Sequence, residues 1–214
     1  MMIRVQYLLA VAAFLIVNNF CEIEAHGKLW DPVNRGSAFK KNFSTPENWN
    51  DDGNYCGGFT VHKQNKGKCG ECGDNWVLPR PRPNENGGKY GRGVIVKTYH
   101  AGSEITVDIH ITAFHEGFVE FALCPLKEKH DLETEDCFDK HKVQFADGTY
   151  KYKPTGRGHF YPRLRLPRGL TCEHCVLRWQ YTAGNNWAIC PDGRGRKGCG
   201  LQETFRTCSD ITIQ

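Results

Sequence analysis

Two histidines stand where they could bind a metal ion, and the first depends on how the chain is processed. Residues 1–25 begin with a positive charge at Arg4, continue through an apolar run over 8–17 and end at Ala25, which is the pattern of a secretory signal peptide. Cleavage after Ala25 would make His26 the amino-terminal residue. Such a histidine can offer a metal two nitrogens, the free α-amine and the ring, which an internal histidine cannot do.

This signal sequence also predicts the compartment and the domain organisation. Cuts near Cys21 or Glu22 are the alternatives, because Ile23 is larger than the residue usually found at its place before a cut. The apolar run spans about ten residues, too few for a bilayer crossing, which needs about 20. We therefore predict a secreted, extracellular protein in which residues 1–25 are removed and residues 26–214 form a single domain.

The second histidine, His115, comes at the end of a predicted strand over 104–112. Alternation along this strand places one set of side chains on a common apolar face: Val107, Ile109, Ile111, Ala113 and His115. Because Gly117 follows, the strand is expected to turn there and leave the imidazole at the rim of the sheet. A histidine at the end of a strand is more often a hydrogen-bonded structural residue than a ligand, so this position alone does not predict a metal site.

Cysteine usage agrees with export. Of 11 cysteines, Cys21 lies in the predicted signal peptide, and the even number that remains predicts five disulfides. The pairs Cys69/Cys72 and Cys172/Cys175 could instead bind zinc, but about a hundred residues separate them, far more than in a compact zinc ribbon. The pairing of the ten cysteines remains open at this stage.

The elements that must position the histidines are predicted to be strands. Residues 26–93 are rich in Gly, Asn, Pro and Cys, and we interpret them as loops with short helical turns. Strand patterns follow at 93–99, 104–112, 118–123, 160–166, 175–181 and 203–213. This series without amphipathic helices favours an all-β, antiparallel sandwich. The formal net charge of +4 is scattered, and its densest patches, at 157–168 and 194–197, are interpreted as solvated loops, so we expect no nucleic-acid partner and no membrane partner.

Nine short stretches, in their order along the chain, carry a family resemblance. They read HG at 26–27, YCGGF at 55–59, GKCGECGD at 67–74, GGKY at 87–90, TAFH at 112–115, LCP at 123–125, LTCEHCVL at 170–177, GNNW at 184–187 and QETFRTCSDI at 202–211. In these the chain resembles the lytic polysaccharide monooxygenases of auxiliary activity family fifteen, over essentially the whole mature length. The resemblance implies an immunoglobulin-like or fibronectin-III-like β-sandwich with long disulfide-pinned loops and short helices.

The resemblance also implies a site with one copper ion, Cu(II) or Cu(I), held in a histidine brace. Its ligands would be the amine and ring of His26 and the ring of His115. Phe205 would match the axial, non-ligating aromatic residue, which is tyrosine in some relatives. Ala113 would match the small residue beside the open coordination position, and Glu203 is a candidate for a supporting group.

The activity implied is oxidative cleavage of an insoluble β-1,4-linked polysaccharide, chitin or cellulose or both, by a monomer. The reaction would use an external reductant together with peroxide or dioxygen. Trp30, Tyr55 and Tyr90 are candidate surface aromatics, although each is more readily interpreted as core. Asn42 begins an N-x-S glycosylation motif.

Three alternatives remain at this stage. A glycoside hydrolase would need two carboxylates about 5–9.5 Å apart, for which Glu116, Glu120 and Glu203 could be proposed. A non-catalytic polysaccharide-binding or matrix protein would keep the sandwich and its disulfides, and a copper carrier would keep the brace. The other histidines are interpreted as single solvated imidazoles: His62, His100, His110, His130, His141, His159 and His174.

Overall fold

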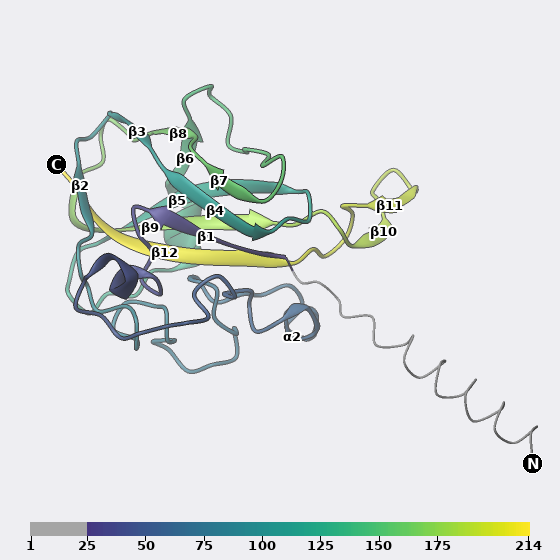
Figure 1. The fold of residues 1–214 in the computed structure, drawn as a ribbon, viewed down its shortest axis with the longest axis horizontal. Coiled ribbons are helices and arrows are strands. Elements are labelled where there is room, and N and C mark those ends of the chain that lie inside the picture. Colours follow the sequence, from purple (N-terminus) through teal and green to yellow (C-terminus); the bar gives the residue numbers. More distant parts are fainter. Residues whose placement is uncertain (1–24) are drawn as a thin grey trace, which may run out of the picture.

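The computed structural model describes residues 25–214, so the predicted signal peptide lies outside the described residues except for Ala25. The strands form two facing sheets and a projecting hairpin (Figure 1). The larger sheet has the spatial order β2 (Lys97–Tyr99), β12 (Thr204–Ile213), β9 (Cys172–Thr182), β5 (Phe118–Leu126), β6 (Lys142–Phe145), β8 (Arg163–Arg165) and β3 (Glu104–Thr106). The smaller sheet has the order β1 (His26–Asp31), β4 (Asp108–Ala113) and β7 (Gly158–Phe160). The hairpin and the helices are β10 (Trp187–Ile189), β11 (Gly195–Lys197), η1 (Ala38–Lys41), α2 (Phe59–Gln64) and α3 (Glu135–Lys140).

The hydrophobic core lies between the two sheets. Ile109 and Ile111 of β4 contribute to the same buried cluster as Phe121 of β5 and Trp179 of β9. The isoleucines of β4 alternate with more exposed side chains, as expected for a sheet that buries one face, whereas Trp179 lies in a continuously buried stretch, 175–179, of β9. The predicted antiparallel sandwich is confirmed, with one departure, since β2 pairs in parallel with β12.

The expectation that residues 26–93 contain no strand is wrong. β1 pairs antiparallel with β4 over nearly its whole length. The sequence of β1 hides this, because Gly27 and Lys28 interrupt the apolar pattern although both are buried. Lys28 can be buried because its Nζ lies 2.7 Å from a carboxylate oxygen of Asp51.

Two predicted strands are each divided between the sheets. The predicted strand over 104–112 breaks at Val107, so that β3 joins the larger sheet and β4 the smaller. The predicted strand over 160–166 breaks in the same way between β7 and β8. Both breaks lie at one corner of the sandwich, where the backbone N–H of Val107 donates to the carbonyl of Pro162. Of the predicted strand over 93–99, only β2 forms.

The five predicted disulfides are present, with the pairs Cys56–Cys69, Cys72–Cys208, Cys124–Cys137, Cys172–Cys175 and Cys190–Cys199. The zinc alternative is wrong, because oxidised sulfurs are not the thiolates that zinc requires. The Cys72–Cys208 bond, with a sequence separation of 136, ties the loop layer to β12.

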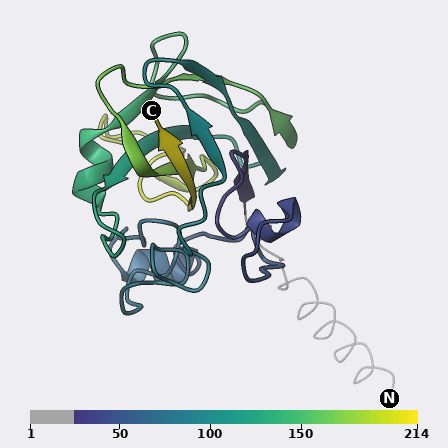
Figure 2. The ribbon, with the colours of Figure 1, turned by 90° about the vertical axis from the view of Figure 1, so that its left-hand side faces the viewer.

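The two ends of the sandwich differ. β1 and β12 both begin at the end from which the β10–β11 hairpin projects (Figure 1). The carboxyl terminus lies at the opposite end, which faces the viewer in Figure 2. Within residues 25–214, no helix is long and apolar enough to cross a membrane.

Candidate metal centre

His26 and His115 reach the same end of the sandwich because β1 and β4 are paired. In the register of this pair, His26 lies opposite Ala113, two residues before His115. β1 can lie this close because residue 27 is a glycine. A Cβ atom there would approach the side chains of Ile111 and Trp179 to 3.0 and 3.1 Å, closer than ordinary contacts.

The backbone of His115 is fixed on both sides. Its N–H donates to the hydroxyl of the buried Tyr181 at 3.0 Å, and its carbonyl accepts from the N–H of Gly184 at 2.8 Å. The Tyr181 hydroxyl in turn donates to the carbonyl of Glu116 at 2.6 Å. Burial, with added repulsion from Glu203 and Glu116, raises the pKa of Tyr181 to about 12, so the hydroxyl keeps the proton that it donates.

The imidazole of His115 has two polar neighbours. Its Nδ1 lies 2.8 Å from the side-chain nitrogen of Asn185 and 3.5 Å from Oε2 of Glu203. The same Oε2 lies 3.4 Å from the backbone nitrogen of Ala25, the residue before His26. One carboxylate oxygen therefore lies near both the backbone nitrogen of Ala25 and the ring of His115.

The side chains that pack against His26 are aromatic. Phe205 is fully buried, and its ring centroid lies 5.9 Å from that of His26. Tyr55 stacks on Phe205 at 5.6 Å and also lies 6.0 Å from the His26 ring. Ala113, opposite His26 in the register, is partly exposed. The ring of His26 therefore packs against two aromatic side chains.

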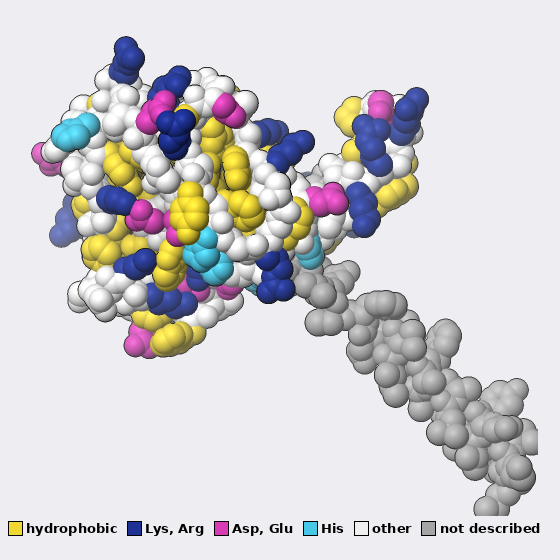
Figure 3. Space-filling view, turned by 45° about the horizontal axis from the view of Figure 1, so that its top comes forward, with side chains coloured by type: hydrophobic (Ala, Val, Ile, Leu, Met, Phe, Trp, Pro, Cys, Tyr) yellow, Lys and Arg dark blue, Asp and Glu magenta, His cyan; other side chains and the backbone are white. Residues whose placement is uncertain are grey.

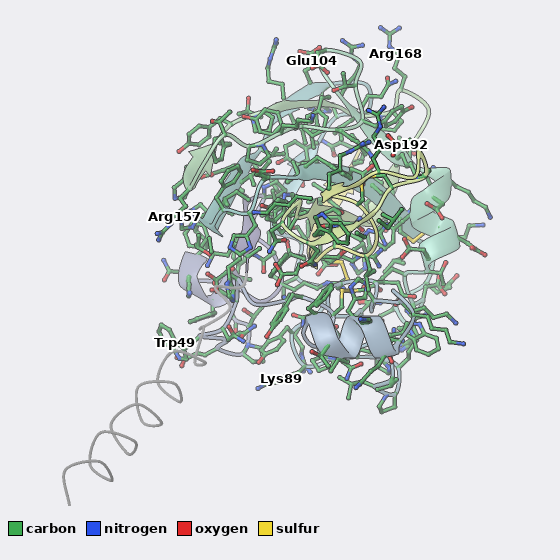
Figure 4. All side chains as sticks on the ribbon, turned by 90° about the vertical axis from the view of Figure 1, so that its right-hand side faces the viewer. Trp49, Lys89, Glu104, Arg157, Arg168 and Asp192 are labelled. Atoms are coloured by element: carbon green, nitrogen blue, oxygen red, sulfur yellow. A yellow bond between two sulfur atoms is a disulfide. The ribbon has the colours of Figure 1, made fainter. Side chains whose placement is uncertain are left out.

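Beside the histidines lie a groove and the hairpin. The groove, of about 590 Å³, is lined by residues that include Phe114, Glu116, Phe118, Lys153 and Lys197. The hairpin projects from the body and carries Lys and Arg together with hydrophobic side chains (Figure 3). Figure 4 views the molecule from this end, with Asp192 on the hairpin and with Trp49 and Arg157 at the margin.

Comparison with known proteins identifies the family to which the chain belongs. A sequence family described as lytic polysaccharide mono-oxygenase, cellulose-degrading, matches residues 26–211. The chain belongs to this family. Among solved structures, the lytic polysaccharide monooxygenase AA15 from Thermobia domestica in the Cu(I) state is 48% identical with a TM-score of 0.86, and the match covers 88% of this chain and 98% of that one. The cellulose-active monooxygenase CelS2 in complex with copper is 16% identical with a TM-score of 0.42, over 87% of this chain and 98% of that one. No curated protein matches the chain.

The chain is thus a lytic polysaccharide monooxygenase, a copper enzyme with one copper ion as cofactor. Its family acts on polysaccharides with an external reductant and an oxygen species. The predictions of family, enzyme class and cofactor made from sequence are confirmed.

From the sequence, Asn185 was missed and four of the histidines were interpreted wrongly. Asn185 contacts His115 across 70 positions, and its only signal was the GNNW stretch. His62 was interpreted as solvated, but it is 3% exposed, and its Nε2 lies 2.8 Å from the carbonyl oxygen of Gly67. His110, His159 and His174 are not single solvated imidazoles either, since each has a side-chain partner.

Proposed function

We propose that the mature enzyme begins at His26, is secreted, and cleaves β-1,4-linked chitin or cellulose oxidatively with a histidine brace of His26 and His115. The observation that carries this proposal is the Glu203 oxygen, which lies within 3.5 Å of both His115 Nδ1 and the Ala25 nitrogen. This supports an amino terminus close to the ring of His115, because Ala25 directly precedes His26. Release of Ala25 would then expose an α-amine beside the ring of His115.

The donor atoms suit copper. Imidazole and amine nitrogens are good copper ligands, and copper stands highest in the divalent affinity order. An α-amine has an ordinary pKa of about 7.7–8.0, so a bound cation displaces its proton readily near neutral pH. When bound, copper supplies the one-electron redox chemistry by which peroxide or dioxygen is activated toward a C–H bond next to the glycosidic oxygen.

Each proposed site residue has a different part in this arrangement. Glu203 can accept the Nδ1 proton of His115, which would leave Nε2 as the ligand atom. Asn185 lies beside the same Nδ1 and restricts rotation of the ring. Phe205 would present only carbon atoms beside His26 and would not act as a ligand. Ala113 has a small side chain, so the space in front of His26 stays open to solvent.

The surroundings favour a solid substrate. Trp187 and Ile189 of the hairpin are 65% and 60% exposed, and the Trp187 ring lies over Gly195, where a Cβ atom would come within 2.2 Å of it. An exposed ring of this kind can stack on a sugar face. Trp30, Tyr55 and Tyr90, the candidates from sequence, are only partly exposed, and Tyr55 packs under His26.

The proposal is tested with three forms of the chain: residues 26–214, the same chain with Ala25 retained, and the His115→Ala variant. Each is loaded with copper and incubated with chitin and with cellulose plus ascorbate, and soluble products are searched by mass spectrometry for oxidised ends. We expect oxidised oligosaccharides from residues 26–214 only. Binding to polysaccharide without oxidised ends would support a matrix protein, copper binding alone a carrier, and unoxidised oligosaccharides a hydrolase; each would overturn the proposal.

Amino-terminal sequencing of secreted protein tests the processing step, and it should begin at His26. The same material reports on glycosylation. Asn42 is exposed in the left-handed conformation that ends η1, so its side chain is accessible to modification.

A further inference from the structure

A pocket far from the candidate metal centre is lined by basic side chains. It has a volume of about 340 Å³ and is formed by three segments that are distant in sequence. Arg92 lies on the first segment, Lys129 and His130 on the second, and His174 of β9 on the third. The other lining residues are Asn86 and three glycines, so among residues 25–214 no carboxylate side chain lines this pocket.

The pocket and the candidate metal centre lie at different ends of the larger sheet. His174 pairs with Leu126, the last residue of β5. Thr182, eight residues further along β9, pairs with Phe118, which follows the turn after His115. Eight residues of extended strand span about 26 Å. A small molecule in the pocket would therefore not reach the copper.

Hydrogen bonds hold the walls of the pocket in place. The side-chain nitrogen of the buried Asn86 donates to the carbonyls of Lys129 and Asp131, at 3.0 and 2.8 Å, and so joins the first segment to the second. Within the first segment, the N–H of Gly87 donates to the carbonyl of Gly91 at 2.8 Å. Walls that are fixed before binding reduce the conformational entropy that a ligand must overcome.

The nearest carboxylates do not cancel the positive charge of the pocket. Among the described residues, neither Arg92 nor Lys129 forms an ion pair. The carboxylate of Asp131 accepts from two backbone N–H groups of its own turn, at 3.0 and 2.9 Å. Asp210 contacts His174 at Nε2, but its two oxygens also accept hydrogen bonds from a buried arginine. Two unpaired cations therefore face this pocket.

We propose that this pocket binds a phosphate or sulfate group, either free or carried on a sugar. Basic side chains from three segments surround the space, which suits an anion with oxygens on several sides. Guanidinium and ammonium groups are both common partners of such oxygens. The volume lies within the range of sites for whole small molecules, which favours a group carried on a sugar. The site is a second, non-catalytic place at which the enzyme holds a charged sugar.

The test uses the mature, copper-loaded chain, titrated at constant ionic strength with inorganic phosphate, glucose 6-phosphate and glucose. Because an anion can also bind at the copper, binding is located by NMR from the backbone amides of Gly87, Gly91 and Gly93. We expect both phosphate compounds to shift these amides, glucose 6-phosphate at the lower concentration, and glucose to leave them unchanged. Shifts with inorganic phosphate alone would support a site for the free anion, and shifts with the ester alone a site for the charged sugar.

Arg92→Gln and Lys129→Gln should each weaken the binding of glucose 6-phosphate about fivefold, because each removes one charged partner. Lys127→Gln is the matched control, since it removes the same charge from an exposed side chain that does not line the pocket. Equal losses in all three variants, no amide shifts with either phosphate compound, or equal shifts with glucose would overturn the site. Oxidation of polysaccharide should be unchanged in the variants, so failure of this site leaves the proposed function untouched.

Discussion

At the scale of single residues, the orientation of His115 depends on a shared hydrogen bond. Nδ1 faces both Asn185 and Glu203, and Nδ2 of Asn185 also lies 3.4 Å from the Glu203 carboxylate. Oδ1 of Asn185 is buried and accepts no hydrogen bond among residues 25–214. Turning this amide over would present Oδ1 to a protonated Nδ1, which is the form that binds metal through Nε2.

Asn185→Ala should therefore weaken copper binding about 10- to 100-fold, the usual effect of removing a group that orients a metal-binding histidine. Copper affinity of residues 26–214, measured by competition with a chelator, checks this. Asn186→Ala is the matched control, because the neighbouring side chain donates to the Leu201 carbonyl and does not contact His115. Equal losses in the two variants would contradict the assigned role.

Phe205→Tyr should leave copper bound but change its electron paramagnetic resonance spectrum and its reduction potential. The ring of residue 205 is buried beside His26, and a hydroxyl there would add an oxygen near the axial direction. Burial of the unpaired hydroxyl should also cost roughly 1–3 kcal/mol in the free energy of unfolding. An unchanged spectrum would show that residue 205 does not face the axial position.

At the scale of elements, the turn between β4 and β5 sets where His115 lies. Gly117 has φ of 83°, and a Cβ atom there would come within 2.0 Å of the carbonyl oxygen of Thr182 on β9. The close contact holds the turn against the larger sheet.

Gly117→Ala should be much more destabilising than Gly148→Ala. Both glycines have positive φ, at 83° and 85°, but nothing lies within 4 Å of a Cβ atom at position 148. The control should lose about 1–2 kcal/mol for the backbone conformation alone, and Gly117→Ala should lose more and also weaken copper binding. Urea unfolding with the disulfides intact measures the first effect and chelator competition the second; similar losses would show that the turn is not tightly packed.

The sequence could predict those parts of the molecule that depend on local pattern. Alternation around Ile109 and Ile111 located the core face of β4 and the place of His115 after it. β1 was missed because Lys28 is buried only through Asp51, 23 positions away. The contact of Asn185 with His115 and the stacking of His110 on His159 likewise join distant segments, and no local pattern records such pairs.

At the scale of the whole molecule, a buried charge cluster joins the loops to the sandwich. Arg35 donates to both Asp210 of β12 and Glu133, and His174 of β9 contacts Asp210 at 2.8 Å. Burial alone would raise the pKa of Asp210, but Arg35 and His174 outweigh it and lower the pKa to about 2. The carboxylate is therefore strongly held in its charged form.

Stability should fall in acid as this carboxylate takes up a proton. The pKa of Asp210 is about 2 in the folded chain, against an ordinary value of 3.8. Its charged carboxylate therefore contributes to the free energy of unfolding above pH 3.8, and this contribution is lost as the pH falls toward 2. The loss should be about 2 kcal/mol, measured as the free energy of unfolding in urea from pH 2 to 7. Asp210→Asn should be less stable at pH 7, and its free energy of unfolding should change less with pH in this range. An unchanged slope of that free energy against pH would show that other groups cause the loss of stability in acid.

The complete burial of Ala25, whose backbone nitrogen is bonded to Glu203, has a consequence for biogenesis. In a finished sandwich the bond to be cut would be out of reach of a peptidase. If the chain is cut after Ala25 as proposed, the cut must come before the first strand docks, and metal can be bound only afterwards. A precursor that folded too soon would carry its leader permanently and remain inert.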